Sequence, residues 1–424
     1  MNIVFVVHYF PPVNSSGAKR VEAISKYLAS DGHSVTVVTT KKTASNGAFT
    51  ESYPQGVNVL ELDSLGRLTA SEEDSGVFEP MYTERPSLKR RVKDVVLNVL
   101  GQVPDPRLPF ALAFASPLLD EKVKQVFNRA DIVIGSAPPW PMILAAVICK
   151  KRFKKPCILD YRDHFSECHE MPGGAFAKWL ELKIDRWLVR NADHVVTISE
   201  PMSSYYKGMT PRVTTIMNGY DHEVLDAARL NVIHADTGNV TLRYMGIVSP
   251  GRVPHNIMKA LVILKERSPA LFDRFKVEYY GGADLIKDAL ARLYPSIATA
   301  FSFHGAVPYL DSLRLIAEAD YLLFAETSSK DSLSAQGILT TKLFEYLGSG
   351  RPVLGDISSQ TLAGSFLVRA SENNVIGTEP EVFLERFSST EFYDRSEDLV
   401  SEFAEGLSRR AQAHQYADVI REVI

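Results

Sequence analysis

The residues whose types and spacing point most directly to chemistry lie between Gln336 and Leu354. A short helix is predicted from Lys342 to Leu347, after a loop that contains Gly337 and before a buried strand. Free backbone N–H groups and the dipole at a helix N-terminus attract anions, and a diphosphate suits such a place. Lys342 opposes the dipole of the first turn, which indicates an anionic partner nearby. We therefore predict that this loop and helix start bind a diphosphate.

Glu345 adds a carboxylate one turn beyond Thr341, on the same face of that helix. Its two oxygens could accept hydrogen bonds from both hydroxyls of a ribose. The alternative is an i, i+3 ion pair between Lys342 and Glu345 on a solvated helix face. The spacing alone does not choose between the two.

These residues need a scaffold, and short apolar strands that alternate with amphipathic helices supply one. Asn2–Val7 is a continuous apolar run typical of a strand buried on both faces, and Val21, Ile24 and Leu28 mark the helix after it. Similar strands recur, each ending in a polar or glycine-containing turn, which predicts α/β doubly wound parallel sheets with function at their carboxyl edge. The predicted strands are Asn2–Val7, Val35–Thr39, Val57–Leu62, Asp131–Ile134, Cys157–Leu159, Val195–Ile198, Val213–Met217, Val240–Tyr244, Val277–Tyr280, Phe301–Phe303, Tyr321–Phe324 and Pro352–Leu354.

The length divides this pattern into two domains. A chain of 424 residues suits two domains of about 200 residues each. The alternation restarts after the polar stretch Leu225–Asn239, which we predict to be the linker. The expected domains are therefore Rossmann-like units at residues 1–225 and 226–424.

The pattern weakens between the second strand and residue 109. Thr69–Pro86 is acidic and polar, which predicts a loop. Ser87–Leu100 carries four basic residues, with valines on another face. This segment is either a solvated amphipathic helix or a patch that touches anionic lipid or a lipid-linked acceptor.

The composition excludes several classes of function. The net charge of −4 and the pI near 6.2 argue against a nucleic-acid partner, which needs a basic surface. No apolar run approaches the roughly 18 residues of a transmembrane helix, and the first residues predict a strand rather than a signal peptide. Cys149, Cys157 and Cys168 lack metal-ligand spacing, so we expect a reduced, cytoplasmic protein without a metal. A zinc site at His164, Cys168 and His169 would lack a second ligand cluster.

A series of motifs, in order along most of the chain, resembles the retaining glycosyltransferases of the GT-B architecture, specifically glycosyltransferase family 4. No single motif is specific, but the ordered series is. The motifs are His8–Pro12 with Ser16–Arg20, Asp131–Ile134 with Pro138-Pro139, Leu159–Asp163, Ile198–Glu200, Met217–Asp221, and Lys342–Leu347 with Gly350–Val353.

The resemblance implies two Rossmann-like domains that face each other across a cleft. The first would bind the acceptor and the second a nucleoside diphosphate sugar such as a UDP- or GDP-sugar. The last helix, at about 400–424, would cross back onto the first domain. The implied reaction transfers the sugar with retention of anomeric configuration and without an obligatory metal or cofactor.

The resemblance also assigns donor-binding residues. Gly17 would let the first helix approach the donor phosphate and the acceptor. Glu345 matches the second glutamate of the family's pair, which binds the donor ribose. The first glutamate is replaced by Gly337, so the backbone N–H groups of Gly337, Ile338, Leu339 and Thr340 would have to hold more of the donor sugar.

Further charged residues fall where the family contacts its substrates. Arg252 follows the first strand of the second domain and would pair with Lys342 or Lys259 on the diphosphate, replacing a metal; its alternative is a surface loop arginine. Arg162 and Asp163 end a strand, and Asp163 could orient an acceptor hydroxyl or act as its base. Their alternative role is to tie neighbouring loops together. His8, after the first strand, is either catalytic or a satisfied turn histidine.

The sequence therefore predicts a glycosyltransferase of the hexosyltransferase type. Its acceptor would be a glycan or a lipid-linked molecule in bacterial cell-surface polysaccharide or lipopolysaccharide assembly, with peripheral contact at the inner face of the plasma membrane. Two alternatives stay open. One is a sugar-nucleotide epimerase with the same fold, and the other is a non-catalytic partner subunit, which the Gly337 departure keeps open.

Overall fold

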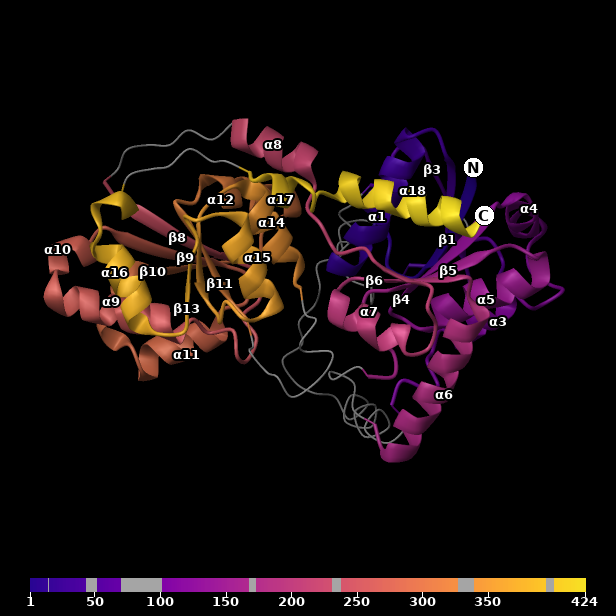
Figure 1. Ribbon diagram of the computed structural model, residues 1–424, viewed down its shortest axis with the longest axis horizontal. Coiled ribbons are helices and arrows are strands. Elements are labelled where there is room, and N and C mark those ends of the chain that lie inside the picture. Colours follow the sequence, from indigo (N-terminus) through magenta and orange to yellow (C-terminus); the bar gives the residue numbers. More distant parts are fainter. Residues whose placement is uncertain are drawn as a thin grey trace. The chain divides into compact units, whose positions relative to one another are not determined.

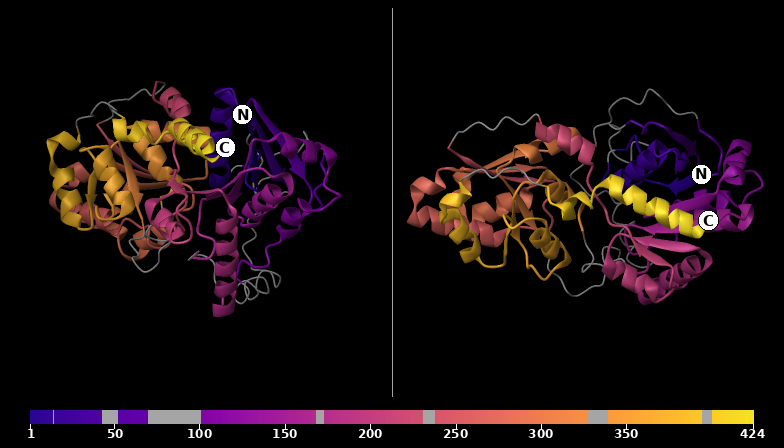
Figure 2. Two further views of the ribbon diagram at one scale, coloured as in Figure 1. Left: turned by 45° about the vertical axis from the view of Figure 1, so that its right-hand side comes forward. Right: turned by 45° about the horizontal axis from the view of Figure 1, so that its top comes forward.

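The computed structural model describes residues 1–13, 15–42, 52–69, 101–167, 173–230, 238–326, 339–393 and 400–424. The chain divides into two compact units (Figures 1 and 2), here called unit 1 (Met1–Met217 with Gln412–Ile424) and unit 2 (Asn218–Ala411). The boundary precedes the predicted one at residue 225. Part of the expected linker is instead the helix α8 (His222–Leu230), which packs on helices of unit 2.

Unit 1 is built on a parallel sheet with the strand order β3-β2-β1-β4-β5-β6-β7. Its strands are β1 (Asn2–Val7), β2 (Ser34–Thr40), β3 (Val57–Leu62), β4 (Ile132–Ala137), β5 (Cys157–Tyr161), β6 (His194–Thr197) and β7 (Val213–Thr215). Its helices are α1 (Ser16–Ser30), α3 (Leu108–Ala113), α4 (Glu121–Arg129), α5 (Pro141–Phe153), α6 (Ala175–Asn191), α7 (Glu200–Lys207) and α18 (Arg409–Val423), the last of which begins in unit 2.

The strands of unit 1 are apolar along their whole length because both faces of the sheet are covered. Alternate residues of β1 point to opposite sides, so Ile3 and Phe5 join a core with α1 and α18, whereas Val4 and Val6 join a core with α3 to α7. Tyr416 and Ile420 on α18 are fully buried in the first of these cores. The C-terminal helix is therefore part of the packing of unit 1 (Figure 1).

Unit 2 has a second parallel sheet, with the strand order β10-β9-β8-β11-β12-β13. Helices α9 and α16 lie on one face of it, and α12, α14 and α15 on the other (Figure 1). Its strands are β8 (Val240–Met245), β9 (Phe275–Tyr280), β10 (Phe301–Gly305), β11 (Tyr321–Ala325), β12 (Val353–Asp356) and β13 (Val375–Gly377). Its helices are α8, α9 (His255–Arg267), α10 (Pro269–Phe272), α11 (Asp284–Arg292), α12 (Tyr309–Glu318), α14 (Thr341–Ser349), α15 (Leu362–Ala370), α16 (Pro380–Ser388) and α17 (Glu402–Glu405), with 3-10 turns at Pro295–Ala300 and Thr390–Phe392.

The predicted class of two doubly wound parallel sheets is confirmed, and each predicted strand overlaps an observed one. The short strand β13 was not predicted. The segments Thr69–Pro86 and Ser87–Leu100 lie outside the described residues except for Thr69. Cys168, His169, Gly337 and Ile338 also lie outside them.

Candidate functional site

Both sheets place candidate residues at a switch point, where the strand order reverses and loops diverge at the carboxyl edge. In unit 1 this point lies between β1 and β4, and in unit 2 between β8 and β11. Ligands bind at such points in open α/β sheets because the loops leave a crevice there.

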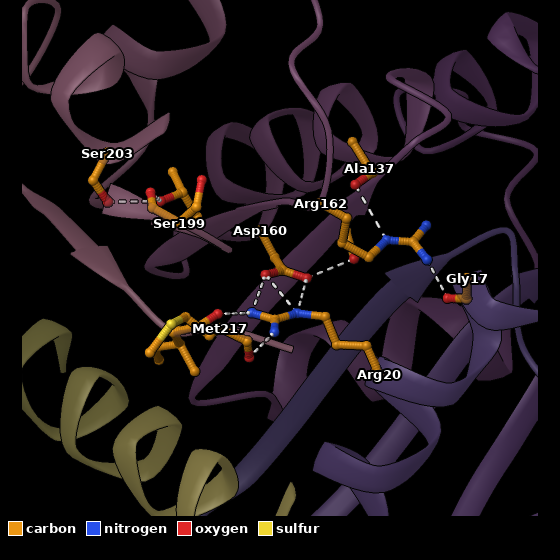
Figure 3. A network of polar contacts seen from close by, with 11 residues as sticks. Gly17, Arg20, Ala137, Asp160, Arg162, Ser199, Ser203 and Met217 are labelled. Carbon is orange, nitrogen blue, oxygen red and sulfur yellow. Dashed lines mark hydrogen bonds and ion pairs between the residues drawn. The ribbon is translucent and has the colours of Figure 1, made fainter. Parts of the chain in front are cut away.

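Arg162, which follows β5, holds the loops of the unit 1 edge together (Figure 3). Its guanidinium donates to the carbonyl oxygens of Gly17, Ala137 and Pro138, and the side chain is buried. These acceptors lie in the first turn of α1, at the last residue of β4 and in the turn after β4. The contacts are those of the loop-tying role that was the alternative to catalysis.

Gly17 lies in the first turn of α1, where the Ser15 hydroxyl accepts a hydrogen bond from the Ala18 N–H at 3.2 Å. A Cβ atom on Gly17 would lie 2.9 Å from Nη1 of Arg162. The structure thus supplies a second reason for a glycine here, besides close approach to a ligand. The missing side chain leaves room for the arginine that ties the loops.

His8 follows β1 and is buried beside Lys42. Its Nδ1 lies 2.6 Å from the Thr40 hydroxyl, and its backbone carbonyl accepts a hydrogen bond from the Lys42 ammonium. Burial, with the charges of Lys42, Arg107 and Arg162, lowers the pKa of His8 to about 3. The imidazole is therefore neutral at physiological pH and is a weak base, so a hydrogen-bonding role suits it better than proton transfer.

Asp163 is exposed at the same edge, next to Arg162. Asp160, three residues earlier, is fully buried and forms an ion pair with Arg20 at 3.0 Å. Burial alone would raise the pKa of Asp160, but the Arg20 charge and hydrogen bonds hold it below its usual value. Asp160 and Arg20 were missed as interacting residues, although an aspartate within an apolar strand is itself a signal of a buried partner.

Arg20 also binds the last residues of unit 1 before the boundary at Met217. Its guanidinium donates to the carbonyl oxygen of Met217 at 2.7 Å (Figure 3). It also donates to the carbonyl oxygen of Ile216 at 2.7 Å and lies 5.7 Å from the ring centroid of Tyr416. The Ser136 hydroxyl donates to Asp160 at 2.7 Å. One buried ion pair thus joins α1, β4, β5, α18 and the last residues before the boundary at Met217.

The unit 2 edge is organised around Glu326, which follows β11. Its buried carboxylate forms an ion pair with Arg252 from the loop after β8. Burial raises the pKa of Glu326, and the charges of Arg252 and Lys342 oppose that shift. Arg252 is thus held by a buried partner, unlike the surface loop arginine considered as its alternative.

Lys342 points into the same cluster from the first turn of α14. Its ammonium donates to the Tyr244 hydroxyl, and it lies 3.9 Å from the centroid of the Tyr244 ring. Burial lowers the pKa of Lys342 to about 7, with Glu326 raising it and Arg252 lowering it further. Within the described residues, the ammonium therefore contacts Tyr244 rather than forming the ion pair with Glu345 that was the alternative.

Helix α14 is tied to the end of β8 by Tyr346, whose hydroxyl accepts a hydrogen bond from the Met245 N–H at 2.9 Å. Thr340 is the N-cap residue, but its hydroxyl accepts no capping hydrogen bond from the described residues. Leu339 is buried beside it. The first turn of α14 therefore has backbone donors available for an anion, next to Arg252 and Lys342.

Glu345 lies on α14 near Tyr309 and Arg409. Burial raises the pKa of Tyr309 and lowers that of Arg409, and the negative charges of Glu345 and Asp221 raise the pKa of both residues. Arg409 in turn donates to the Gly219 carbonyl at 3.0 Å and to the Tyr309 hydroxyl at 3.4 Å. The structure thus surrounds Glu345 with groups that neither prediction for it included.

Two kinds of feature are absent from the described residues. These residues contain no group of three or more His, Cys, Asp or Glu side chains placed to hold a metal ion. Among the same residues, no helix combines the length and apolar character needed to cross a bilayer.

Comparison with known proteins finds one family domain that matches part of the chain. Residues 17–219 match the model of the glycosyl transferase 4-like domain. No curated protein sequence matches the chain significantly.

Three solved structures illustrate the similarity in fold. HepE from Anabaena, in complex with UDP and glucose, has a TM-score of 0.57 at 13% identity over 100% of both chains. A point mutant of TarM from S. aureus, in complex with fondaparinux, α-GlcNAc-glycerol and UDP, has a TM-score of 0.60 at 9% identity, covering 99% of this chain and 100% of its own. The lipopolysaccharide outer core galactosyltransferase WaaB has a TM-score of 0.55 at 12% identity over 100% of both chains. At these identities the likeness establishes the fold, which is GT-B.

Proposed function

Since residues 17–219 match the glycosyl transferase 4-like domain and the chain has the GT-B fold, we propose that it transfers a sugar from a nucleoside diphosphate sugar, with retention of anomeric configuration. The observation that carries the donor assignment is the cluster at the carboxyl edge of the unit 2 sheet. There Arg252 and Lys342 lie against a single buried carboxylate, Glu326, beside the N-terminus of α14.

The charges of this cluster suit a diphosphate leaving group. The cluster has two basic residues and one acid, and the helix start adds partial positive charge. A bound diphosphate would neutralise the remaining positive charge. As the glycosidic bond breaks, negative charge grows on the diphosphate, and Arg252 and Lys342 would stabilise it there. We infer that these two residues do the work that a metal does in other transferases.

The rest of the donor would lie along the same segment. We propose that Glu345 accepts hydrogen bonds from the ribose hydroxyls. The backbone N–H groups from Gly337 to Thr340 would hold the sugar. Support for both comes from the family pattern and from the position of Glu345 one turn after the helix start.

Unit 1 would bind the acceptor at its own carboxyl edge. Asp163 is exposed there and could orient or deprotonate an acceptor hydroxyl, whereas His8 is neutral and would contribute hydrogen bonds. We propose a glycan or lipid-linked acceptor in cell-surface polysaccharide assembly at the inner face of the plasma membrane. Support is the likeness in fold to a lipopolysaccharide galactosyltransferase.

A panel of UDP- and GDP-sugars tests the donor half of this proposal. The full chain should bind one of them and slowly release the nucleoside diphosphate with free sugar when no acceptor is added. Conversion of the donor to its epimer would instead identify the epimerase alternative. Failure to bind any nucleotide would reject both enzymes and favour the non-catalytic subunit.

A further inference from the structure

Helix α6 of unit 1 exposes an unusual set of side chains. Phe176, Trp179 and Trp187 are large hydrophobic residues with 73%, 53% and 44% of their surface exposed. Lys183, Arg186 and Arg190 are exposed on the same helix. We call these six residues the α6 stripe.

The stripe is one continuous face of the helix. At 3.6 residues per turn, its six residues fall within about 100° of arc and span about 21 Å along the axis. The opposite face is buried against unit 1 and includes Leu188 and Val189. An amphipathic pattern would fill the outer face with polar groups of both signs, but here aromatic rings alternate with cations.

The acids of α6 are absent from this face. Glu181 and Asp185 are both fully buried: Glu181 accepts a hydrogen bond from the Gln102 N–H, and Asp185 accepts one from Tyr161. The charges that α6 exposes are therefore all positive. Asp193, just after the helix, is engaged by Lys150 at 2.6 Å.

The end of helix α5 extends the positive surface. Lys151 lies 4.5 Å from the centroid of the Trp187 ring, and Lys183 lies 5.7 Å from that of Trp179. Lys154 follows α5 and is exposed. Cations thus flank both exposed indoles.

We propose that the α6 stripe binds the surface of an anionic lipid bilayer. Indole and phenyl rings favour the depth of the lipid headgroups, where they bury apolar surface and keep their polar edge wet. Lysine and arginine on the same face are attracted to anionic headgroups. All the charges of the stripe are positive, so it complements an anionic bilayer surface, whereas a protein partner would need a matching acidic face. The inference rests on this surface alone and does not depend on the proposed transfer reaction.

The tryptophans provide a direct test. The chain has three of them, and Trp140 is buried whereas Trp179 and Trp187 lie in the stripe. Vesicles of phosphatidylcholine mixed with phosphatidylglycerol, carrying brominated acyl chains, should quench and blue-shift the emission of the full chain. The Trp179→Phe/Trp187→Phe variant, which retains only Trp140, should co-sediment with the same vesicles without quenching.

A charge variant and a matched control test the electrostatic part. Lys183→Gln/Arg190→Gln should weaken co-sedimentation roughly tenfold or more. Lys122→Gln/Arg129→Gln removes one lysine and one arginine that are exposed on α4 of the same unit, and it should bind as the wild type does. Added NaCl should weaken the binding of the wild type.

Three results would overturn the proposal. They are equal binding to pure phosphatidylcholine, equal losses in the two charge variants, and no binding of the wild type to any vesicle. If the wild type instead forms dimers that dissociate in Lys183→Gln/Arg190→Gln, a second copy covers the stripe. Nucleotide affinity should be the same in every variant, so failure here is separate from failure of the proposed function.

Discussion

Arg252 and Glu326 form an ion pair across the switch point of the unit 2 sheet, from the loop after β8 to the end of β11. The carboxylate is buried, whereas 22% of the Arg252 side chain is exposed. The pair therefore holds a cation at the edge where ligands bind in such sheets. We interpret Glu326 as a positioning residue: it fixes the arginine, and the arginine keeps one side accessible for a phosphate.

Proton uptake should accompany binding of the nucleoside diphosphate. Lys342 has a pKa of about 7 in the free protein, and a diphosphate beside it would raise that value. Near pH 7 the lysine is partly neutral and must gain a proton on binding, so affinity should fall as the pH rises above 7. Calorimetry in buffers of different ionisation enthalpy measures the uptake. Lys342→Arg, which stays charged, should abolish it, and persistence of the uptake in that variant would assign it to another group.

Replacing Gly17 with alanine should disturb the unit 1 edge. The new Cβ would lie 2.9 Å from Nη1 of Arg162, so the guanidinium must move away from the carbonyls it binds. We expect a loss of about 1–3 kcal/mol in the free energy of unfolding, measured by denaturant titration, and slower donor turnover. Gly406→Ala, whose Cβ would meet nothing closer than 3.5 Å, is the control. Equal effects of the two substitutions would show that the space beside Arg162 is unimportant.

Asp185 should make unit 1 more stable as the pH falls from 7 to 5. Burial raises its pKa from 3.8 to about 6, against hydrogen bonds from Tyr161, Ser166 and Tyr206. The folded state then binds this proton more tightly than the unfolded chain does, so lowering the pH through 6 adds to stability, by about 1 kcal/mol at pH 5. The difference between wild type and Asp185→Asn across this range isolates the effect. Asp418→Asn, exposed on α18, should follow the wild type, and a flat difference for Asp185→Asn would refute the assignment.

Glu345→Ala separates ribose binding from a structural role. If Glu345 accepts the ribose hydroxyls, the variant should bind the preferred nucleoside diphosphate at least roughly tenfold more weakly. Its affinity for the 2′-deoxy analogue should change much less. A lower Tm with an unchanged ribose preference would instead mean that Glu345 serves Arg409 and Tyr309, which it faces in unit 2.

Most of the fold could be predicted from the sequence because buried parallel strands are apolar along their whole length. Runs such as Asn2–Val7 and Tyr321–Phe324 are visible without any structure. The exceptions have physical reasons. Val375–Gly377 has three residues, too few for a periodic signal, and the helix His222–Leu230 falls in a polar stretch because only Leu225 is buried.

The residues that form the site could be predicted from the sequence, but the contacts between them could not. Arg252, Lys342 and Glu345 were placed from motif order, and the structure brings the first two to one cluster. Glu326, the partner of Arg252 and Lys342, is not close to either in sequence. Contacts across a sheet leave no local pattern in the sequence. Arg162 shows the same limit, since its three acceptors are backbone carbonyls and no residue type marks them.

The central claim, that the unit 2 edge binds the diphosphate of the donor, is tested most directly by comparing nucleoside diphosphate with nucleoside monophosphate. Calorimetric titration of the wild type should show tighter binding of the diphosphate. Arg252→Ala should reduce that preference roughly tenfold or more, whereas Arg267→Ala, exposed at the end of α9, should leave it unchanged. An unchanged preference in Arg252→Ala, or a wild type that binds neither nucleotide, would contradict the account.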